Sequence, residues 1–299
     1  MDKTKVVLIT GSSSGFGLLT TRTLLEQGYT VIASMRGLNA KNKEHADSLK
    51  KFAESKPGRL HLIELDVTSD SSVDAAVKQA IELSGHIDVV VNNAGFGVAG
   101  FAETITIPQF QKNFDVNVFG VQRVSRAVLP AMRKQGHGLI INISSIIGRM
   151  VMPFAGAYVA TKYALEGLSE SYRYELAGTG VDVVIVEPGG FGTNFLENME
   201  PAADSDRLKS YGPLAEMPEK MWGGFAENLK GDDAPDPQVV ADAIAKLIDT
   251  PAGQRPLRTV VDPMMGGEAT RTINQTTDKI QAELLGNLGM SDFISVKGN

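Results

Sequence analysis

The sequence predicts an α/β protein built on a doubly wound, parallel, seven-stranded sheet. Short β-branched runs alternate with helix-patterned stretches, glycine follows the first run, and polar residues follow several later ones. Parallel strands buried on both faces are expected to be rich in apolar, β-branched residues, as these runs are. The candidate strands cover residues 5–10, 30–34, 60–65, 87–91, 138–143, 181–187 and 258–262.

Helix-patterned stretches fill the intervals between these strands. They cover residues 15–27, 69–84, a segment that begins near Pro108, 157–178 and 236–249. In the last stretch Asp236 and Pro237 supply a helix N-cap and a proline at the first helical position. The strand and helix order therefore indicates repeated βαβ units.

The chain has 299 residues, a length for which two domains are a reasonable first guess. Every motif described below nevertheless falls on one sheet, so residues 1–263 are interpreted as a single catalytic domain. Residues 193–236 are rich in Pro, Asp, Gly and Met without a clear period, which is typical of a functional loop and predicts a substrate lid. Residues 264–299 carry apolar residues at roughly helical spacing and predict a helical tail packed on the domain or on a partner subunit.

Composition excludes several functions. The chain has 29 Lys and Arg against 35 Asp and Glu, a net charge of −6, which disfavours nucleic acid and anionic membrane surfaces as partners. It has no cysteine, and its four histidines stand singly, so no metal site is expected. The first apolar run is too short for a signal peptide and no run approaches a membrane span, so we expect a cytoplasmic protein.

A glycine-rich turn follows the first strand. Residues 10–17 read Thr-Gly-Ser-Ser-Ser-Gly-Phe-Gly and open the first helix. Backbone N–H groups in such a turn, together with the helix N-terminus, can bind a pyrophosphate, although similar turns also occur without a ligand. In the first βα turn of a Rossmann-type sheet the motif favours a dinucleotide. The residues of the turn expected to contact it are Gly11, Ser13, Ser14, Gly15, Phe16 and Gly17.

The end of the second strand distinguishes the two nicotinamide dinucleotides. An NAD-selective site would place a carboxylate there to bind the ribose 2′-OH. The sequence instead has Ser34 and Arg36, whose hydroxyl and guanidinium suit a 2′-phosphate. We therefore expect NADP(H) rather than NAD(H), with an exposed loop arginine as the alternative interpretation of Arg36.

Tyr158 and Lys162 share one helix face, one turn apart. A neighbouring ammonium lowers the pKa of a phenol, so the pair can act as acid and base, although a solvated helix pair would have the same spacing. Ser145 follows the strand over 138–143 and so lies at the ligand-binding edge of the sheet. His137 precedes that strand, roughly 20 Å away, which disfavours a Ser-His-Asp hydrolase.

In this order the motifs resemble those of the short-chain dehydrogenase/reductase family, from about residue 6 to residue 193. The motifs that carry the resemblance are the turn at 10–17, Asp66-Val67, Asn92-Asn93-Ala94-Gly95, Asn117, Ser145, Tyr158 to Lys162, and Pro188-Gly189 with Thr193. Within the family, the sequences around the first strand, Arg36 and Phe96 are most similar to the 17β-hydroxysteroid and retinol dehydrogenase branch.

The resemblance implies roles for these residues. Tyr158 would be the general acid/base, Lys162 would lower its pKa and bind the nicotinamide ribose, and Asn117 would hold a water that relays protons to Lys162. The family serine stands 13 positions before the tyrosine, which selects Ser145 over Ser144. The further residues that the resemblance places on the cofactor are Asp66, Val67, Asn93, Ala94, Gly95, Pro188, Gly189, Phe191 and Thr193, beside Tyr158 and Lys162.

The implied reaction is hydride transfer between NADP(H) and a secondary alcohol or carbonyl compound. Apolar residues near the motifs and on the predicted lid suggest a bulky hydrophobic aldehyde, ketone or hydroxysteroid-like substrate. Alternatively, many of them simply pack the core. The candidate substrate-contacting residues are Phe96, Phe101, Ser145, Met150, Val151, Phe191, Met199, Met221 and Trp222.

Family members commonly pair subunits through the helix that carries the tyrosine and lysine, which implies a homo-oligomer, either a dimer or a tetramer. Leu165, Leu168, Tyr172 and Leu176 would form its outward face, unless they pack inward. A non-catalytic NADP(H)-binding regulator and a dehalogenase-like enzyme are the alternatives, and the retained Tyr158 and Lys162 disfavour both.

Overall fold

A computed structural model of the chain describes residues 5–231, 233–294 and 296. Its main sheet has seven parallel strands in the order β3-β2-β1-β4-β6-β7-β9, which confirms the predicted doubly wound sheet. The strand order reverses between β1 and β4, the place where such sheets bind ligands. The strands are β1 (Val6–Thr10), β2 (Thr30–Met35), β3 (Arg59–Glu64), β4 (Val89–Asn92), β6 (Gly138–Ile143), β7 (Val181–Pro188) and β9 (Arg258–Val261).

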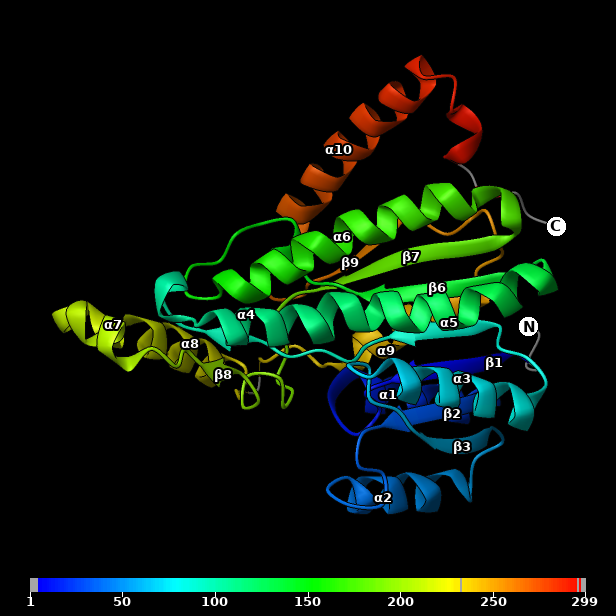
Figure 1. Cartoon of the computed structure of the whole chain (residues 1–299), viewed down its shortest axis with the longest axis horizontal. Helices are drawn as coiled ribbons and strands as arrows, with labels where there is room; N and C mark the ends of the chain where they lie inside the picture. The colour runs from blue at the N-terminus through cyan, green and yellow to red at the C-terminus, as the bar shows by residue number, and fades with distance from the viewer. Residues whose placement is uncertain (1–4, 232, 295, 297–299) are drawn as a thin grey trace.

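Helices cover both faces of this sheet (Figure 1). One face packs against α1 (Gly15–Glu26), α2 (Lys43–Ala53) and α9 (Gln238–Asp249) through a buried apolar core. The other packs against α3 (Asp70–Ser84), α5 (Gly120–Gln135) and α6 (Gly156–Leu176) through a second core. The sheet therefore separates two hydrophobic layers, and its carboxyl edge is left for a ligand.

Helix α2 lies outside the predicted helices. Its sequence is rich in Lys, Glu and Asp, and only Ala46 and Leu49 are buried. An apolar stripe this narrow gives little periodic signal. The helix forms because Leu49 reaches the core beneath it.

The predicted lid is more regular than the sequence indicated. The expectation of an irregular segment is wrong for α7 (Ser205–Ser210) and α8 (Met217–Asn228), which project from the sheet in Figure 1. Pro218 lies in the first turn of α8, where proline suits a helix, but the adjacent Gly223 and Gly224 conceal its period. A short strand, β8 (Glu200–Pro201), pairs with β5 (Val98–Ala99) and joins the lid to the body.

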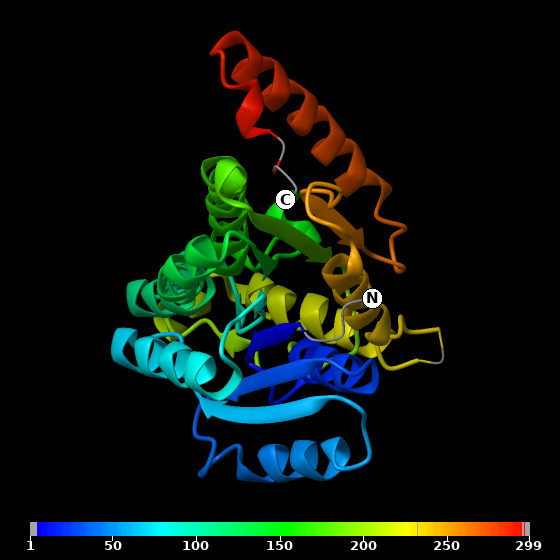
Figure 2. The same cartoon turned by 90° about the vertical axis from the view of Figure 1, so that its right-hand side faces the viewer.

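The C-terminal segment forms α10 (Glu268–Asn287), whose orientation is clear in Figure 2. Its first half contacts β9 and buries Thr270 and Asn274. Its second half extends away from the sheet, with Ile280 and Leu284 exposed. The tail is thus held by the first half of α10 on β9, and beyond α10 the short helical turn over Ser291–Phe293 comes back to contact α6.

Two of the four apolar residues that could have formed an outward face of α6 turn fully inward, and Leu168 is half-buried outside the core clusters. Leu165 and Leu176 are buried, and Tyr172 packs partly against the core between α5 and the sheet. Their position follows from the packing of α6 on β7. Association into a homo-oligomer stays a prediction. None of the described helices is long and apolar enough to cross a membrane.

Candidate active site

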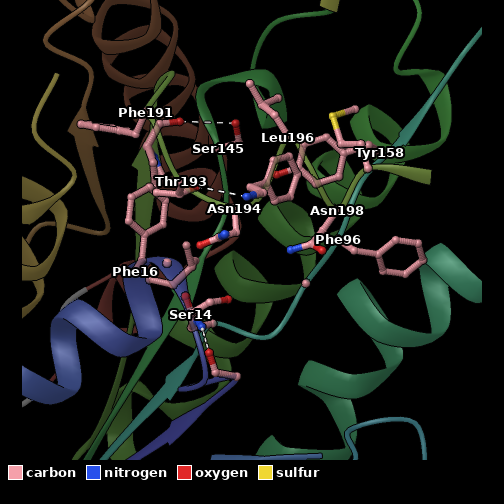
Figure 3. Close-up of a pocket in the computed structure, with 18 of the residues that line it drawn as sticks. Ser14, Phe16, Phe96, Ser145, Tyr158, Phe191, Thr193, Asn194, Leu196 and Asn198 are labelled. Atoms are coloured by element: carbon pink, nitrogen blue, oxygen red, sulfur yellow. Dashed lines mark hydrogen bonds between the residues drawn. The ribbon is translucent and has the colours of Figure 1, made fainter. Parts of the chain in front are cut away.

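One cavity of about 1020 Å³ lies along the carboxyl edge of the sheet. It runs from the glycine turn after β1, past the ends of β6 and β7, to the lid. Figure 3 shows Ser14 and Phe16 of the turn at one side and Tyr158 at the other, with Thr193, Asn194 and Leu196 of the lid between them. The cavity is therefore elongated and joins the two predicted half-sites.

The glycine turn is built so that backbone can approach closely. A Cβ at Gly17 would lie 2.4 Å from the Gly11 carbonyl oxygen and 2.4 Å from Nδ2 of Asn93. Gly15 has a φ of +54° and faces open space, with Cβ of Thr193 3.8 Å from its would-be Cβ. The turn, the first N–H groups of α1 and Thr193 thus surround a space suited to an anion.

A loop after β2 closes the far end of this half-site. Arg36 lines the cavity together with Lys41 and His45, which the sequence analysis did not identify. The carboxylate of Glu64 accepts hydrogen bonds from the backbone N–H of Gly37, 2.6 Å, and of Leu38, 2.7 Å, and so holds the loop. Lys41 and His45 come from a loop and the following helix. Their closeness in sequence to Arg36 was the only signal that they line the same end of the cavity.

Tyr158 is the buried phenol of the site, only 8 % exposed, near the start of α6. Burial raises its pKa well above the ordinary value, and a hydrogen bond with Ser145 partly offsets that rise. The Ser145 hydroxyl has a single proton, which it can donate instead to the Pro188 carbonyl, 3.3 Å away, at the end of β7. The neighbouring Ser144 instead faces Glu166, so the two adjacent serines point toward different groups.

Lys162 is buried one turn further along α6. Its Nζ donates to the Ile143 carbonyl, 2.7 Å, at the end of β6, and lies 5.5 Å from the centre of the Tyr158 ring. Burial lowers the pKa of Lys162 to about 8, while the charge of Glu166 acts in the opposite direction. The ammonium can therefore lose its proton near neutral pH, which a solvated lysine does not do.

Asn117 lies on a π-helical turn, Asp115–Phe119, between α4 (Ile107–Phe114) and α5. Such turns are frequent at functional sites. Its Oδ1 accepts from the Phe96 N–H, 3.1 Å, and its Nδ2 donates to the Phe96 carbonyl, 2.9 Å, and to Oγ1 of Thr161, 3.0 Å. The side chain therefore ties the loop after β4 to α6, behind the cavity wall.

The structure places most of the predicted cofactor residues on the cavity wall. Those that line it are Gly11, Ser13, Ser14, Gly15, Phe16, Arg36, Val67, Asn93, Ala94, Gly95, Tyr158, Lys162, Pro188, Gly189, Phe191 and Thr193. Gly17, Ser34, Asp66 and Asn117 are not among the residues that line it.

Two of these side chains form hydrogen bonds outside the cavity. Their position at a strand end in the sequence does not indicate these partners. The Ser34 hydroxyl points back into the sheet and donates to the Ile9 carbonyl, 2.9 Å. Asp66 accepts from the N–H of Thr68, 3.0 Å, and from its hydroxyl, 2.8 Å. Ser34 is therefore not positioned to bind a phosphate as predicted.

The end of the cavity opposite the glycine turn is apolar. Residues of the predicted lid, 193–236, form most of its wall. Phe96, Met199, Met221 and Trp222 line it, as Ser145 and Phe191 do. Met150, Val151 and Phe101 do not: Val151 is 75 % exposed, Met150 packs against the cluster around Ile146, and Phe101 stacks on Tyr211. Lid and loop residues that the sequence analysis missed complete the wall, among them Met152, Asn194, Phe195, Leu196, Asn198 and Phe225.

Three contacts hold the segments around this end of the cavity, including the predicted lid, against the body. The ring of Phe195 lies 5.1 Å from that of Tyr158, and Nε1 of Trp222 donates to the Phe154 carbonyl, 3.1 Å. Lys112 forms an ion pair with Glu200 of β8. These contacts come from segments far apart in the sequence, so no single motif could indicate them.

Comparison with known proteins agrees with this arrangement. A model of the short chain dehydrogenase family matches residues 5–204. The chain is 37 % identical over 251 residues to the uncharacterized oxidoreductase YusZ of Bacillus subtilis (strain 168), covering 81 % of this chain and 84 % of that protein. It is 35 % identical over 266 residues to a 3-ketodihydrosphingosine reductase of Bacteroides thetaiotaomicron, covering 87 % and 89 %.

A crystal structure of a short-chain dehydrogenase from Streptomyces avermitilis superposes with a TM-score of 0.72 at 34 % identity, covering 96 % of this chain and 98 % of that one. The sheet order, the cavity at its carboxyl edge and these likenesses lead to one conclusion. The chain is an oxidoreductase with a nicotinamide-dinucleotide-binding fold, and it belongs to the short-chain dehydrogenase/reductase family.

Proposed function

We propose that this protein transfers hydride reversibly between NADP(H) and the carbonyl or alcohol carbon of a bulky hydrophobic substrate. The observation that carries the proposal is the meeting of Tyr158, Ser145 and Lys162 at the point where the glycine-turn half of the cavity meets its apolar half. The cofactor, when bound, supplies or accepts the hydride. A likeness to the 17β-hydroxysteroid and retinol dehydrogenase branch stays a prediction.

The residues of the chain position the reacting oxygen and move its proton. The hydroxyl of Ser145 and the phenol of Tyr158 form a hydrogen-bonded pair that can hold a carbonyl oxygen. With its raised pKa, Tyr158 keeps its proton until it is donated in reduction. Lys162, whose pKa is about 8, supports the phenolate that remains and can return a proton to it.

In this proposal Asn117 holds other residues of the site in place. Its amide joins the Phe96 backbone to Thr161 on α6 and so fixes the helix that carries Tyr158 and Lys162. A water held beside Asn117 and Lys162 would complete a proton path to solvent, as the family resemblance implies. The bonds to Phe96 and Thr161 give Asn117 a structural task as well.

The preference for NADP(H) rests on charge at the Arg36 end of the cavity. Arg36 and Lys41 carry positive charge there, and His45 adds a third side chain that can be protonated. A ribose 2′-phosphate has charge and oxygen acceptors to match them. Among the described residues that line this end there is no carboxylate that could bind a free 2′-OH. The nearby carboxylate of Glu64 already accepts two backbone N–H groups of the loop.

The substrate class follows from the apolar end. Methionine and aromatic side chains of the lid, with Phe96 opposite, form a wall that can adapt to large hydrophobic bodies. The polar residues of the lid that line the cavity are Thr193, Asn194, Asn198, Glu200 and Asn228. We therefore expect aldehydes and ketones with an extended or multi-ring apolar body to react better than small ones.

The test is the variant Tyr158→Phe, which removes the phenol oxygen and keeps the ring. We expect NADPH-dependent reduction to fall by about 10³-fold, within the range that a general acid contributes. The variant should bind NADPH with the same affinity as the unsubstituted protein, as measured by NADPH fluorescence. Turnover is measured by NADPH absorbance across a panel of aldehydes and ketones.

The matched control is Tyr163→Phe, which removes the same atom from an exposed tyrosine on α6. It should leave turnover and NADPH binding unchanged. Near-normal turnover by Tyr158→Phe would contradict the assignment of the acid/base. NADPH binding by the unsubstituted protein without turnover of any carbonyl compound would favour the non-catalytic regulator.

A further inference from the structure

Two buried glutamates lie directly behind the proposed site. Glu166 is 2 % exposed and follows Lys162 by one turn of α6. Glu187 is fully buried at the end of β7 and precedes Pro188, whose carbonyl accepts the Ser145 hydroxyl. Both carboxyl groups are therefore attached to elements that carry site residues.

A single arginine serves both carboxyl groups. Nε of Arg258, on β9, lies 2.9 Å from Oε2 of Glu166 and 3.9 Å from Oε1 of Glu187. The two remaining nitrogens bind Glu170 of α6 and, at 2.7 Å, Asp278 of α10. The guanidinium of Arg258 thus has four carboxyl groups around it, and Arg149 acts on the same four from further away, so the carboxyl groups outnumber the guanidinium groups by four to two.

The neighbours of the two carboxyl groups differ. Glu166 has the close ion pair with Arg258 and faces the hydroxyl of Ser144. Glu187 accepts from Nδ2 of Asn274 on α10, 2.6 Å, and reaches Arg258 only at the longer distance. Burial raises the pKa of both carboxyl groups, but Glu166 has the closer cation and therefore the better environment for a negative charge.

Each carboxyl group also has an oxygen without a donor. Within the part of the chain that the structure describes, Oε1 of Glu166 and Oε1 of Glu187 are buried and have no hydrogen-bond partner. Two buried carboxylates that share one cation are costly to ionise together, and a proton held by one of them removes that cost. The other charged groups that face them are Lys162 and Glu170 of α6, Arg149 before α6, and Asp278 of α10.

We propose that Glu166 and Glu187 hold one proton between them, with Glu187 the neutral member, and that ionised Glu166 is a positioning residue that keeps Lys162 protonated. Burial, followed by the charge of Glu166, raises the pKa of Glu187 to about 8, in agreement with this assignment. The role assigned to Lys162 rests on the proposed function, whereas the shared proton does not. Helix α10, through Asn274 and Asp278, then closes the cluster and becomes part of the support of the site.

The first experiment compares Glu166→Gln with Glu187→Gln in the full-length protein. Loss of the Glu166 charge should lower the pKa of Lys162, so the alkaline limb of the kcat/KM profile for carbonyl reduction should move down by about one pH unit. Glu187→Gln mimics a neutral carboxyl group and should leave that limb in place. The matched control, Glu170→Gln, removes another carboxylate from Arg258 at a position further from Lys162 and should also leave it.

The second readout needs no turnover. The side-chain resonance of Lys162, assigned by its disappearance in Lys162→Arg, should titrate near pH 8 and shift to lower pH in Glu166→Gln only. Should Glu166→Gln fail to fold, Glu166→Asp keeps a charge at a shorter reach and should give a smaller shift in the same direction. An unmoved Lys162 titration in Glu166→Gln, or an equal shift in Glu187→Gln, would overturn the proposal.

The third readout tests the shared proton alone. Folded protein keeps a proton on Glu187 that the unfolded chain releases above about pH 4.5, so melting temperature should fall as pH rises from about 4.5 to about 8. Glu187→Gln should flatten this fall. If the melting temperature of Glu187→Gln falls with pH as steeply as that of the unsubstituted protein, the shared proton is refuted. If the slope is lost in Glu187→Gln but the unsubstituted protein reduces no carbonyl compound, only the proposed reaction is contradicted.

Discussion

The two ends of the cavity are built in different ways. The end at the glycine turn is made by residues 10–17, the loop after β2 and the ends of β4 and β7, all supported directly by strands of the main sheet. The opposite end is made by Phe96 and by lid residues, which reach the body through the short β5–β8 pairing and a few side-chain contacts. One end is therefore part of the sheet, and the other is attached to it.

This difference separates the cofactor site, which the family shares, from the substrate wall, which can differ from one member to the next. Backbone at a sheet edge has few alternatives, so a cofactor site built on it depends on a short sequence pattern. A loop packed by scattered side chains can change without disturbing the sheet. We expect changes at the glycine-turn end to alter cofactor binding or folding, and changes in the lid to alter substrate use alone.

Among the changes that compare the two ends, the largest effect is expected at the loop after β2. Arg36→Asp replaces a cation that faces the proposed 2′-phosphate with an anion, so NADPH affinity should fall by about 100-fold while NADH affinity changes little. The measurement is the pair of dissociation constants from fluorescence titration. Arg133→Asp, on an exposed arginine in the last turn of α5, is the charge-matched control. An unchanged preference between the two cofactors would rule out the role of Arg36.

A smaller effect is expected at Gly17. The new Cβ in Gly17→Ala would overlap the Gly11 carbonyl and the Asn93 amide, and overpacking of this kind costs about 1–3 kcal/mol of stability. Chemical denaturation measures the change, and NADPH titration should show weaker binding. Gly167→Ala is the control, because a Cβ there meets nothing within 4 Å in the middle of α6. It should be neutral or stabilising, so an equal loss in both variants would mean that Gly17 has no special packing role.

The smallest effect is expected in the lid. Trp222→Phe keeps an aromatic wall but loses the hydrogen bond to the Phe154 carbonyl, worth about 0.5–1.5 kcal/mol, so KM for a hydrophobic ketone should rise about 3- to 10-fold. NADPH affinity and kcat should stay close to their original values. Tyr211→Phe removes a lid hydroxyl that binds exposed Glu103, away from the cavity wall, and serves as the control. A drop in NADPH affinity for Trp222→Phe would show that the two ends are not independent.

The elements that could be predicted from sequence are those with local signals. Most strands of the main sheet are largely apolar runs, and Tyr158 and Lys162 follow from helical spacing. The inward turn of Ser34 could not be predicted, because a strand end does not show which neighbour its hydroxyl will meet. Helix α8 was missed because Gly223 and Gly224 weaken its pattern, and its packing on the site compensates for their low propensity.

Sequence by itself determined the doubly wound sheet, the glycine turn and the order of the polar residues along its edge. These follow from periodicity and from the fact that parallel strands end on one side. Tertiary structure alone decided which side chains face the cavity, how Phe195 and Trp222 close it, and that Glu166, Glu187 and Arg258 meet behind Lys162. Such contacts join residues far apart in the chain, and packing and burial select them only once the whole fold is assembled.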